Sequence, residues 1–221
     1  MNFDLAAMGA KPRYNLLTAL VVPRPIAWVT SRNASGQLNV APFSFFNLMS
    51  GNPPVLCLGV GARDGIPKDT ARNILETSDF VVNLVSEACL PAMNATAIDF
   101  PPQVDEAQEA GLALEDCIHI DVPRLAISPV ALECRLMQAV PFGVGRNILI
   151  ADILSAHVRN DAVLNAERGH IDAFALEMVG RMHGGGWYAR ARDGFRLPRL
   201  KEEDWRSQAS VQSPEQGTLP D

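Results

Sequence analysis

The sequence lacks the residue patterns that identify several large classes of protein. Its four cysteines, Cys57, Cys89, Cys117 and Cys134, are far apart and form no Cys-x-x-Cys pair. Its four histidines are also scattered, and neither residue type has the spacing of a zinc site. We therefore expect no bound metal. We interpret the cysteines as free thiols, mostly in or near the core, as in a cytoplasmic protein.

Positive charge is scarce as well. The chain has 19 Lys and Arg against 25 Asp and Glu, a formal net charge of −6. Because a nucleic-acid-binding protein needs a basic stripe to neutralise phosphates, we expect no nucleic-acid partner. The longest apolar runs are strand-sized, well short of the roughly 20 residues of a membrane-spanning helix. The first fifteen residues have no basic segment ahead of an apolar core, so we expect no signal peptide, no membrane partner and a cytoplasmic location.

The familiar nucleotide and hydrolase motifs are also missing. Gly59-Val60-Gly61 and Gly143-Val144-Gly145 each lack the third glycine and the following helix of a dinucleotide-binding fingerprint. The sequence has no Gly-x-x-x-x-Gly-Lys-Ser/Thr loop and no Gly-x-Ser-x-Gly elbow. Any chemistry must therefore come from other residues.

The chain has 221 residues, of which 48% are hydrophobic, a balance typical of one globular domain with elaborations. We expect a single domain over residues 1–200 and a polar tail over residues 201–221. Strands do not alternate regularly with helices, which favours a closed or split antiparallel barrel with helical insertions over a parallel sheet. Residues 55–60 form a continuous apolar run, so we expect that strand to be buried on both faces. The expected strands are 16–22, 26–30, 38–43, 55–60, 79–86, 131–140 and 147–158, and the expected helices are 68–77, 87–97 and 105–111.

Residues 24–47 concentrate hydroxyls, amides and aromatic rings in a short span. Two extended runs flank the turn-rich segment Asn33-Ala34-Ser35-Gly36, a pattern typical of a β-hairpin. Such a hairpin can hold a flat ligand with polar edges, with Ser44 and Asn39 at its rim and Phe45 on its face. It can equally be an ordinary hairpin with a polar turn, in which the phenylalanines pack in the core.

Residues 68–73 (Lys-Asp-Thr-Ala-Arg-Asn) mark the expected start of a helix, with Asp69 or Thr70 as its N-cap. The N–H groups and positive dipole end of a helix start, next to the ammonium of Lys68 and the hydroxyl of Thr70, suit one phosphate. The alternative is a capped surface helix with a solvated lysine.

A glycine triplet, 184–186, lies between His183 and Tyr188. If the segment is functional, the glycines let the backbone approach a ligand closely, and Tyr188 forms a wall of the pocket. The alternative is a flexible turn that closes a hairpin.

Taken together, three segments resemble one known family. The segments Arg24–Ser31 (RPIAWVTS), Asn39–Phe46 (NVAPFSFF) and Lys68–Ile74 (KDTARNI) are similar to the flavin reductase-like family of FMN-binding split barrels. This family includes flavoredoxin-type proteins and reductase components of two-component monooxygenases. The segment from Gly180 through the glycines to Tyr188 agrees, and the resemblance ends near Arg199.

The resemblance implies an antiparallel split β-barrel, a homodimer, and FMN bound near the subunit interface, with FAD as a possible substitute. It implies that the flavin ring and ribityl chain contact the first strand and the Asn-x-Ala-Pro-x-Ser segment, and that the Lys-Asp-Thr segment meets the phosphate. His183 and Trp187 stand where many relatives are simpler, so we assign His183 only to the pocket lining and name no catalytic side chain. The residues implied for cofactor binding are Arg24, Thr30, Ser31, Asn39, Ala41, Ser44, Phe45, Lys68, Asp69, Thr70, Asn73 and Tyr188.

The implied reaction is hydride transfer from NAD(P)H to flavin N5, with a monooxygenase or another acceptor as the electron partner. The chemistry then belongs to the cofactor, and the protein supplies binding and orientation. Two alternatives stay open at this point. One is an FMN-binding electron carrier, flavoredoxin-like, that makes no direct use of NAD(P)H. The other is a flavin-free structural or ligand-sensing dimer.

Overall fold

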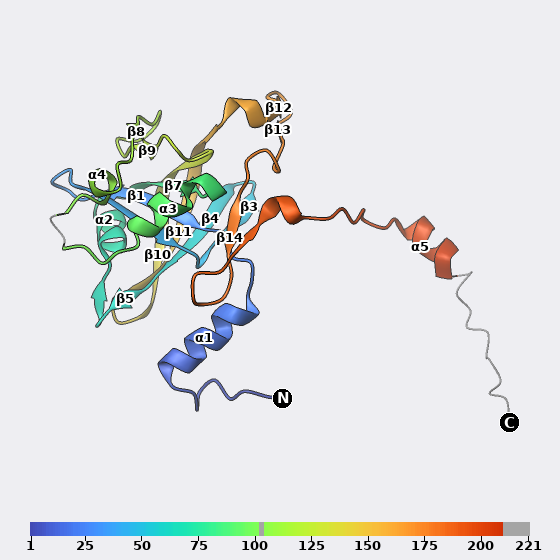
Figure 1. The fold of residues 1–221 in the computed structure, drawn as a ribbon, viewed down its shortest axis with the longest axis horizontal. Helices are drawn as coiled ribbons and strands as arrows, with labels where there is room; N and C mark the ends of the chain where they lie inside the picture. The colour runs from blue at the N-terminus through green and yellow to red at the C-terminus, as the bar shows by residue number, and fades with distance from the viewer. Residues whose placement is uncertain (102–103, 210–221) are drawn as a thin grey trace.

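The structure, a computed structural model, describes residues 1–101 and 104–209. A seven-stranded antiparallel sheet forms its centre, in the order β2-β1-β7-β10-β11-β4-β3 (Figure 1). The fold is therefore mainly β with helical insertions, as expected. The strands are β1 (Ala27–Arg32), β2 (Leu38–Phe43), β3 (Phe46–Gly51), β4 (Pro54–Val60), β7 (Asp79–Leu84), β10 (Val130–Gly143) and β11 (Arg146–Val158).

Four short two-stranded ladders and several helices connect or cover the sheet. The ladders are β5 (Ala62–Arg63) with β6 (Ile66–Pro67), β8 (Leu114–Glu115) with β9 (Arg124–Leu125), β12 (Val163–Asn165) with β13 (His170–Ile171), and β14 (Val179–Arg181) with β15 (Tyr188–Arg190). The α-helices are α1 (Ala10–Leu20), α2 (Asp69–Thr77), α3 (Leu90–Ala95), α4 (Glu106–Glu109) and α5 (Glu202–Ala209). Single 3₁₀ turns lie at Glu87–Cys89, Asn160–Ala162 and Ala191–Asp193.

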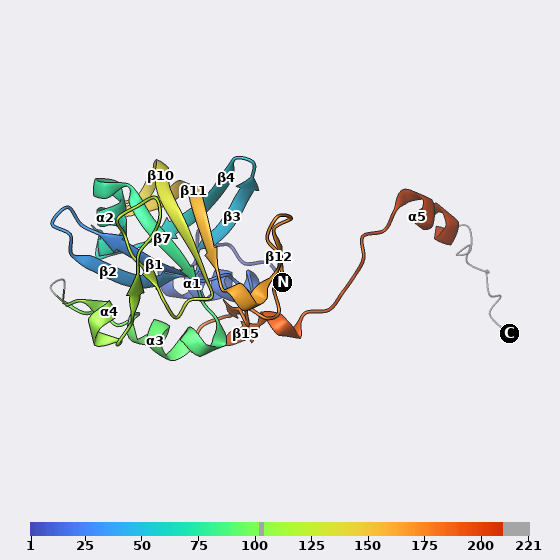
Figure 2. The same cartoon turned by 90° about the horizontal axis from the view of Figure 1, so that it is seen from above.

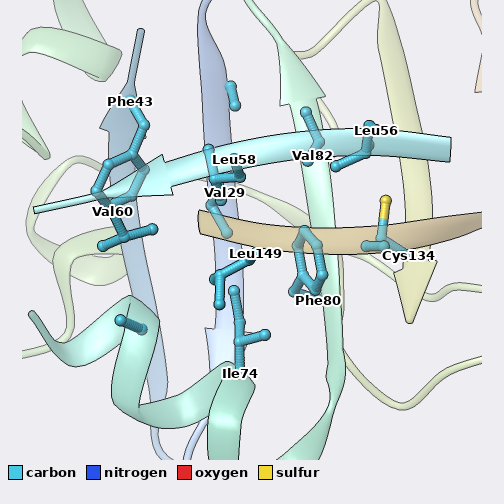
Figure 3. Packing of buried hydrophobic residues seen from close by; sticks show 13 residues of the cluster. Val29, Phe43, Leu56, Leu58, Val60, Ile74, Phe80, Val82, Cys134 and Leu149 are labelled. Carbon is cyan, nitrogen blue, oxygen red and sulfur yellow. The ribbon is translucent and has the colours of Figure 1, made fainter. Parts of the chain in front are cut away.

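The sheet folds over on itself around one apolar cluster. In Figure 3, β4 and β11 cross over β1 and β7, and the side chains of Leu58, Val29 and Phe80 lie between them. Phe43 of β2 and Ile74 of α2 belong to the same cluster. Strands from both halves of the sheet thus share one core, which is the arrangement expected of a split barrel.

Strand β1 is buried on both faces, because a second cluster covers its other side. Trp28 is fully buried there, together with Val40 of β2 and Met93 of α3. The indole N–H of Trp28 donates a 2.8 Å hydrogen bond to the hydroxyl of Thr96. This double burial fixes the orientation of every side chain on β1, and therefore fixes the hairpin that contributes to the site.

Three expectations about local structure are wrong, and one strand was not expected. Residues 16–22 were expected as a strand, but residues 10–20 form helix α1, because a short apolar run does not distinguish strand from helix. In β4 the burial alternates, so its outer residues are partly exposed. The N-cap of α2 is Lys68, and its side chain makes no cap hydrogen bond. Strand β3 extends the sheet beyond the expected hairpin.

The chain after residue 193 leads away from the body of the molecule to α5 (Figure 2). Phe195, Leu197 and Trp205 of this segment are 91%, 84% and 60% exposed. No helix in the described part of the chain is long and apolar enough to cross a membrane.

Candidate functional site

The β1–β2 hairpin sorts the predicted site residues onto two faces. Ser31 of β1 pairs with Asn39 of β2, and Thr30 pairs with Val40. Because consecutive strand residues point to opposite faces, Ser31 and Asn39 share the face that meets α2. Thr30 points the other way, and its hydroxyl donates a 2.6 Å hydrogen bond to the carbonyl of Pro123.

The start of α2 is bonded to this hairpin by two buried hydrogen bonds. The amide of Asn39 donates to the hydroxyl of Thr70 at 2.8 Å, and the amide of Asn73 donates to the hydroxyl of Ser31 at 3.2 Å. Four predicted residues therefore form one buried polar connection. It holds the helix start, with its unpaired backbone N–H groups, at the edge of β2.

A cavity of about 430 Å³ opens beside this helix start. Its walls come from β2 (Asn39 and Ala41), the first turn of α2, and residues 63–67 and 96–100. This volume lies within the range of about 300–1,000 Å³ that is usual for ligand pockets. The cavity thus has the size of a mononucleotide site.

Charged side chains surround the cavity, and their partners differ. Arg63 forms an ion pair with Asp99 at 2.8 Å, and Arg72 pairs with Asp69. Among the residues that the structure describes, Lys68 has no carboxylate partner. Its ammonium lies 5.6 Å from the centre of the ring of Phe43. Lys68 is therefore the cation of this cavity that is available to a phosphate.

Glu106 adds a carboxyl group to the same wall. Its Oε2 accepts a hydrogen bond of 3.1 Å from the backbone N–H of Val40. Burial raises the pKa of this carboxyl above its ordinary value, and the N–H of Val40 offsets part of the rise. A partly buried acceptor so placed can bind a hydroxyl group of a ligand.

A second cavity, of about 200 Å³, adjoins the first, and the two share Pro42 and Ala97. Ser44 and Tyr188, both predicted site residues, line it. Its apolar lining includes Phe43, the residue whose ring lies 5.6 Å from the Lys68 ammonium.

The guanidinium donors of Arg24, a predicted cofactor-binding residue, bind neighbouring groups of the chain. Nη1 donates to the carbonyls of Thr18 and Val21 at 2.6 and 2.9 Å, and Nη2 donates to the carbonyl of Met182 at 2.8 Å. Nε donates to the hydroxyl of Ser44 at 3.3 Å. Arg24 lines neither of the two cavities. Its hydrogen bonds join α1 to the β14–β15 hairpin.

Three other predicted residues also lie outside the two cavities. Phe45 is 53% exposed and contacts the ring of Tyr14 edge-on, at 6.3 Å between ring centres. His183 is exposed, and its ring lies 6.0 Å from that of Trp187. Ser31 is fully buried, and its hydroxyl accepts the hydrogen bond from the amide of Asn73 on α2. Thr30 is a fourth, since its hydroxyl is bonded to the carbonyl of Pro123 and it lines neither cavity. Asn73 lines a smaller cavity beside Asn39, and the remaining predicted residues line one of the two.

Sequence reasoning missed several cavity residues. Arg181, Met93 and Asn94 line the second cavity, and Arg63 and Glu106 line the first. Arg181 was visible as part of the Gly180–Met182 segment, but the pattern gave it no role. The others come from α3, α4 and the short strand β5, where nothing in the sequence indicates which residues meet a pocket.

The chain is similar to known proteins along nearly its whole length. It is 48% identical to a protein of Deinococcus radiodurans over 94% of this chain and 93% of the relative. Two solved structures superpose closely. Nitrilotriacetate monooxygenase component B from Bacillus cereus is 34% identical, with a TM-score of 0.84, over 89% of this chain and 98% of the other. The 2-nitrobenzoate 2-nitroreductase NbaA of Pseudomonas fluorescens is 33% identical, with a TM-score of 0.83, over 91% and 98%.

The profile of the Flavin reductase like domain matches residues 19–175. This match spans the β1–β2 hairpin, the start of α2 and the whole seven-stranded sheet. By this match, and by relatives that share more than 30% of their residues with it, the chain belongs to the flavin reductase-like family, the family of flavin-related oxidoreductases.

Proposed function

We propose that this chain binds FMN in the larger cavity and catalyses the reduction of flavin by NAD(P)H. The observation that carries the proposal is the position of Lys68. Its ammonium has no carboxylate partner in the described part of the chain, and Lys68 is the N-cap residue of the helix whose start opens onto a cavity of about 430 Å³. A phosphate at one end of a mononucleotide is the ligand group that this arrangement suits best.

The residues present fit a flavin mononucleotide. Lys68, the hydroxyl of Thr70 and the first N–H groups of α2 would hold the phosphate. Asn39 and Ala41 of β2 would line the ribityl chain, and Ser44 lies further along the same segment.

When bound, the flavin supplies the ring that accepts a hydride. The protein then has to position a nicotinamide against that ring and keep water away from it. The apolar lining of the second cavity would receive only the nicotinamide ring, since it adjoins the first at Pro42 and Ala97, and the rest of the NAD(P)H would lie outside it. No side chain is required to move a proton in the hydride step, so His183, exposed beside Trp187, is not assigned as a base.

We also propose that two copies associate. Exposed apolar side chains lie on β3, β10 and β11, which together with β4 make up one half of the sheet. Monomeric proteins seldom leave such a group of apolar side chains in water. Its members are Leu48, Met49, Met137, Val140, Phe142, Ile148 and Leu154.

The proposal also covers the compound or protein that accepts electrons from the reduced flavin. Two structural relatives are named as a monooxygenase component and as a nitroreductase. A diffusible aromatic compound or a monooxygenase that takes up reduced flavin are therefore the acceptors to test first.

The absorption spectrum of the purified protein tests the function, recorded with FMN before and after anaerobic addition of NADH or NADPH. We expect flavin bands that move with the protein through gel filtration and that bleach on addition of the nicotinamide. Bleaching only by a reduced protein partner would instead indicate an electron carrier. Failure to bind any flavin would leave only the flavin-free alternative.

A further inference from the structure

The second cavity contains an arginine with an unusual set of neighbours. Arg181, at the end of β14, is half-buried, and its guanidinium lies 4.8 Å from the centre of the ring of Tyr188. Its backbone pairs with Arg24, whose N–H donates to the carbonyl of Arg181 at 2.9 Å. The guanidinium is therefore held at the cavity wall by a stacked ring and a short ladder.

No carboxylate of the described chain pairs with Arg181. By contrast, the two arginines that line the larger cavity are neutralised, Arg63 by Asp99 and Arg72 by Asp69. On the same hairpin, Arg190 forms a bidentate pair with Glu87 at 2.5 and 2.7 Å. A half-buried guanidinium that lines a cavity without an acidic partner is a site for an anion from outside the chain.

A second positive charge reinforces the field there. The guanidinium of Arg24 is buried and lies close enough to Arg181 to feel its charge. Burial is the main cause that lowers the pKa of Arg24, and the charge of Arg181 lowers it further. The positive charges of Arg24 and Arg181 repel each other, so a negative group that binds beside Arg181 stabilises both.

The rest of the cavity determines the shape of that anion. Its apolar walls are Ile26, Phe43 and Met93, and its polar groups are the hydroxyl of Ser44 and the amide of Asn94. Aromatic and thioether side chains of this kind pack against flat rings. At about 200 Å³ the cavity is smaller than the usual range of about 300–1,000 Å³, so it suits a single ring and excludes a nucleotide.

We propose that the second cavity binds a planar aromatic carboxylate, with the carboxylate paired to the guanidinium of Arg181 and the ring packed against Phe43 and Met93. The site adjoins the proposed flavin cavity at Pro42 and Ala97, so it rests on the proposed function for its role as an acceptor site. The binding itself depends only on this chain and can be measured without flavin.

Calorimetric titration of the full chain with benzoate, and with its neutral analogue benzamide, tests the site. We expect benzoate to bind about tenfold or more tightly than benzamide, because a charge-assisted pair with arginine recognises only the anion. Arg181→Met should abolish this preference, and Arg181→Lys should retain part of it, since lysine keeps the charge without the planar fork. The matched control is Arg190→Gln on the same hairpin, which should leave the preference unchanged.

The titrations are repeated with FMN present, and the thermal midpoint of each variant is recorded to confirm folding. Equal affinities for benzoate and benzamide in the unaltered chain would overturn the inference. So would a benzoate preference that survives in a folded Arg181→Met variant. A chain that binds FMN but shows no such preference would refute this inference alone. A chain that shows the preference but binds no FMN would refute the proposed function alone.

A further readout separates this role from a role toward the flavin itself. If Arg181 instead serves the reduced flavin, Arg181→Met should shift the midpoint potential of the bound flavin and leave benzoate affinity unchanged. That result would overturn the inference.

Discussion

The side-chain amide of Asn39 donates a 2.8 Å hydrogen bond to the hydroxyl of Thr70. Asn39 lies on β2, Thr70 lies in the first turn of α2, and both side chains are more than nine-tenths buried. The bond fixes the start of a helix against the edge of a strand at the wall of the larger cavity. The same connection thus stabilises the fold and orients the groups proposed to meet the phosphate.

The first prediction concerns that phosphate. Replacing Lys68 and Thr70 together by alanine removes the ammonium and the hydroxyl, and should weaken FMN binding by roughly ten- to a hundredfold, from the usual worth of hydrogen bonds to a charged group. Riboflavin, which lacks the phosphate, should lose much less. Fluorescence titration measures both affinities, with Lys201→Ala as a control at an exposed lysine. Equal losses for the two ligands would refute the phosphate assignment.

The sequence predicted the hairpin and the helix of the site because both have local causes. Two extended runs and an Asn-x-Ser-Gly turn define the hairpin, and the turn closes with a 2.9 Å bond from the N–H of Gly36 to the carbonyl of Asn33. The amphipathic pattern of residues 69–77 defines α2. Local patterns of this kind place Asn39 on a strand and Thr70 at a helix start, and it was the resemblance that related the two segments to one ligand.

The parts that the sequence could not predict depend on contacts between distant segments. Thr30 and Ser31 were grouped as ligand contacts, but consecutive strand residues face opposite ways, and only the packing determines which one faces α2. The donors of Arg24 are satisfied by carbonyls that include that of Met182, 158 positions away. The absence of an acidic partner at Arg181 is likewise a property of the folded chain.

The second prediction concerns Glu133, a fully buried carboxylate on β10. It accepts hydrogen bonds from the backbone N–H groups of Ile118 and His119 at 2.8 and 2.7 Å, and its Oε1 lies 2.6 Å from Nε2 of His157. Burial raises the pKa of Glu133, but these bonds outweigh it and the pKa lies below its ordinary value of 4.5. Its contribution to stability is therefore fully present above pH 4.5 and is lost as the pH falls through the lowered pKa.

Glu133→Gln should accordingly lower the free energy of unfolding at pH 7 by about 1.5–3 kcal/mol, the usual worth of hydrogen bonds to a charged group. The difference from the unaltered chain should shrink below pH 4.5. Urea unfolding followed by tryptophan fluorescence measures it. Glu202→Gln, in an exposed pair with Arg206, should change stability by less than about 1 kcal/mol. A loss of unfolding free energy in Glu133→Gln that does not change with pH would show that the charge of Glu133 contributes nothing to stability.

The third prediction concerns the close packing of the β14–β15 hairpin. A Cβ at Gly180 would lie 2.7 Å from Cβ of Pro23, closer than two carbons can approach. Gly180→Ala should therefore cost about 1–3 kcal/mol of stability, as overpacking usually does. Gly184, in the loop of the same hairpin, has open space around its Cβ position, so Gly184→Ala should be nearly neutral. Thermal unfolding of the two variants provides the comparison, and equal midpoints would contradict the close approach.

The last prediction concerns the association of two copies. Val140 of β10 and Ile148 of β11 are paired neighbours in the sheet, and they are 36% and 38% exposed. If this half of the sheet meets a second copy, Ile148→Glu places a charge in a desolvated interface and should shift the protein from dimer to monomer. Analytical ultracentrifugation over a range of concentrations measures the change. Leu164→Glu is the control, because Leu164 is 70% exposed on β12, outside the seven-stranded sheet, and should leave the dimer intact. A monomeric unaltered chain, or an Ile148→Glu variant that remains dimeric, would show that β10 and β11 do not form the interface.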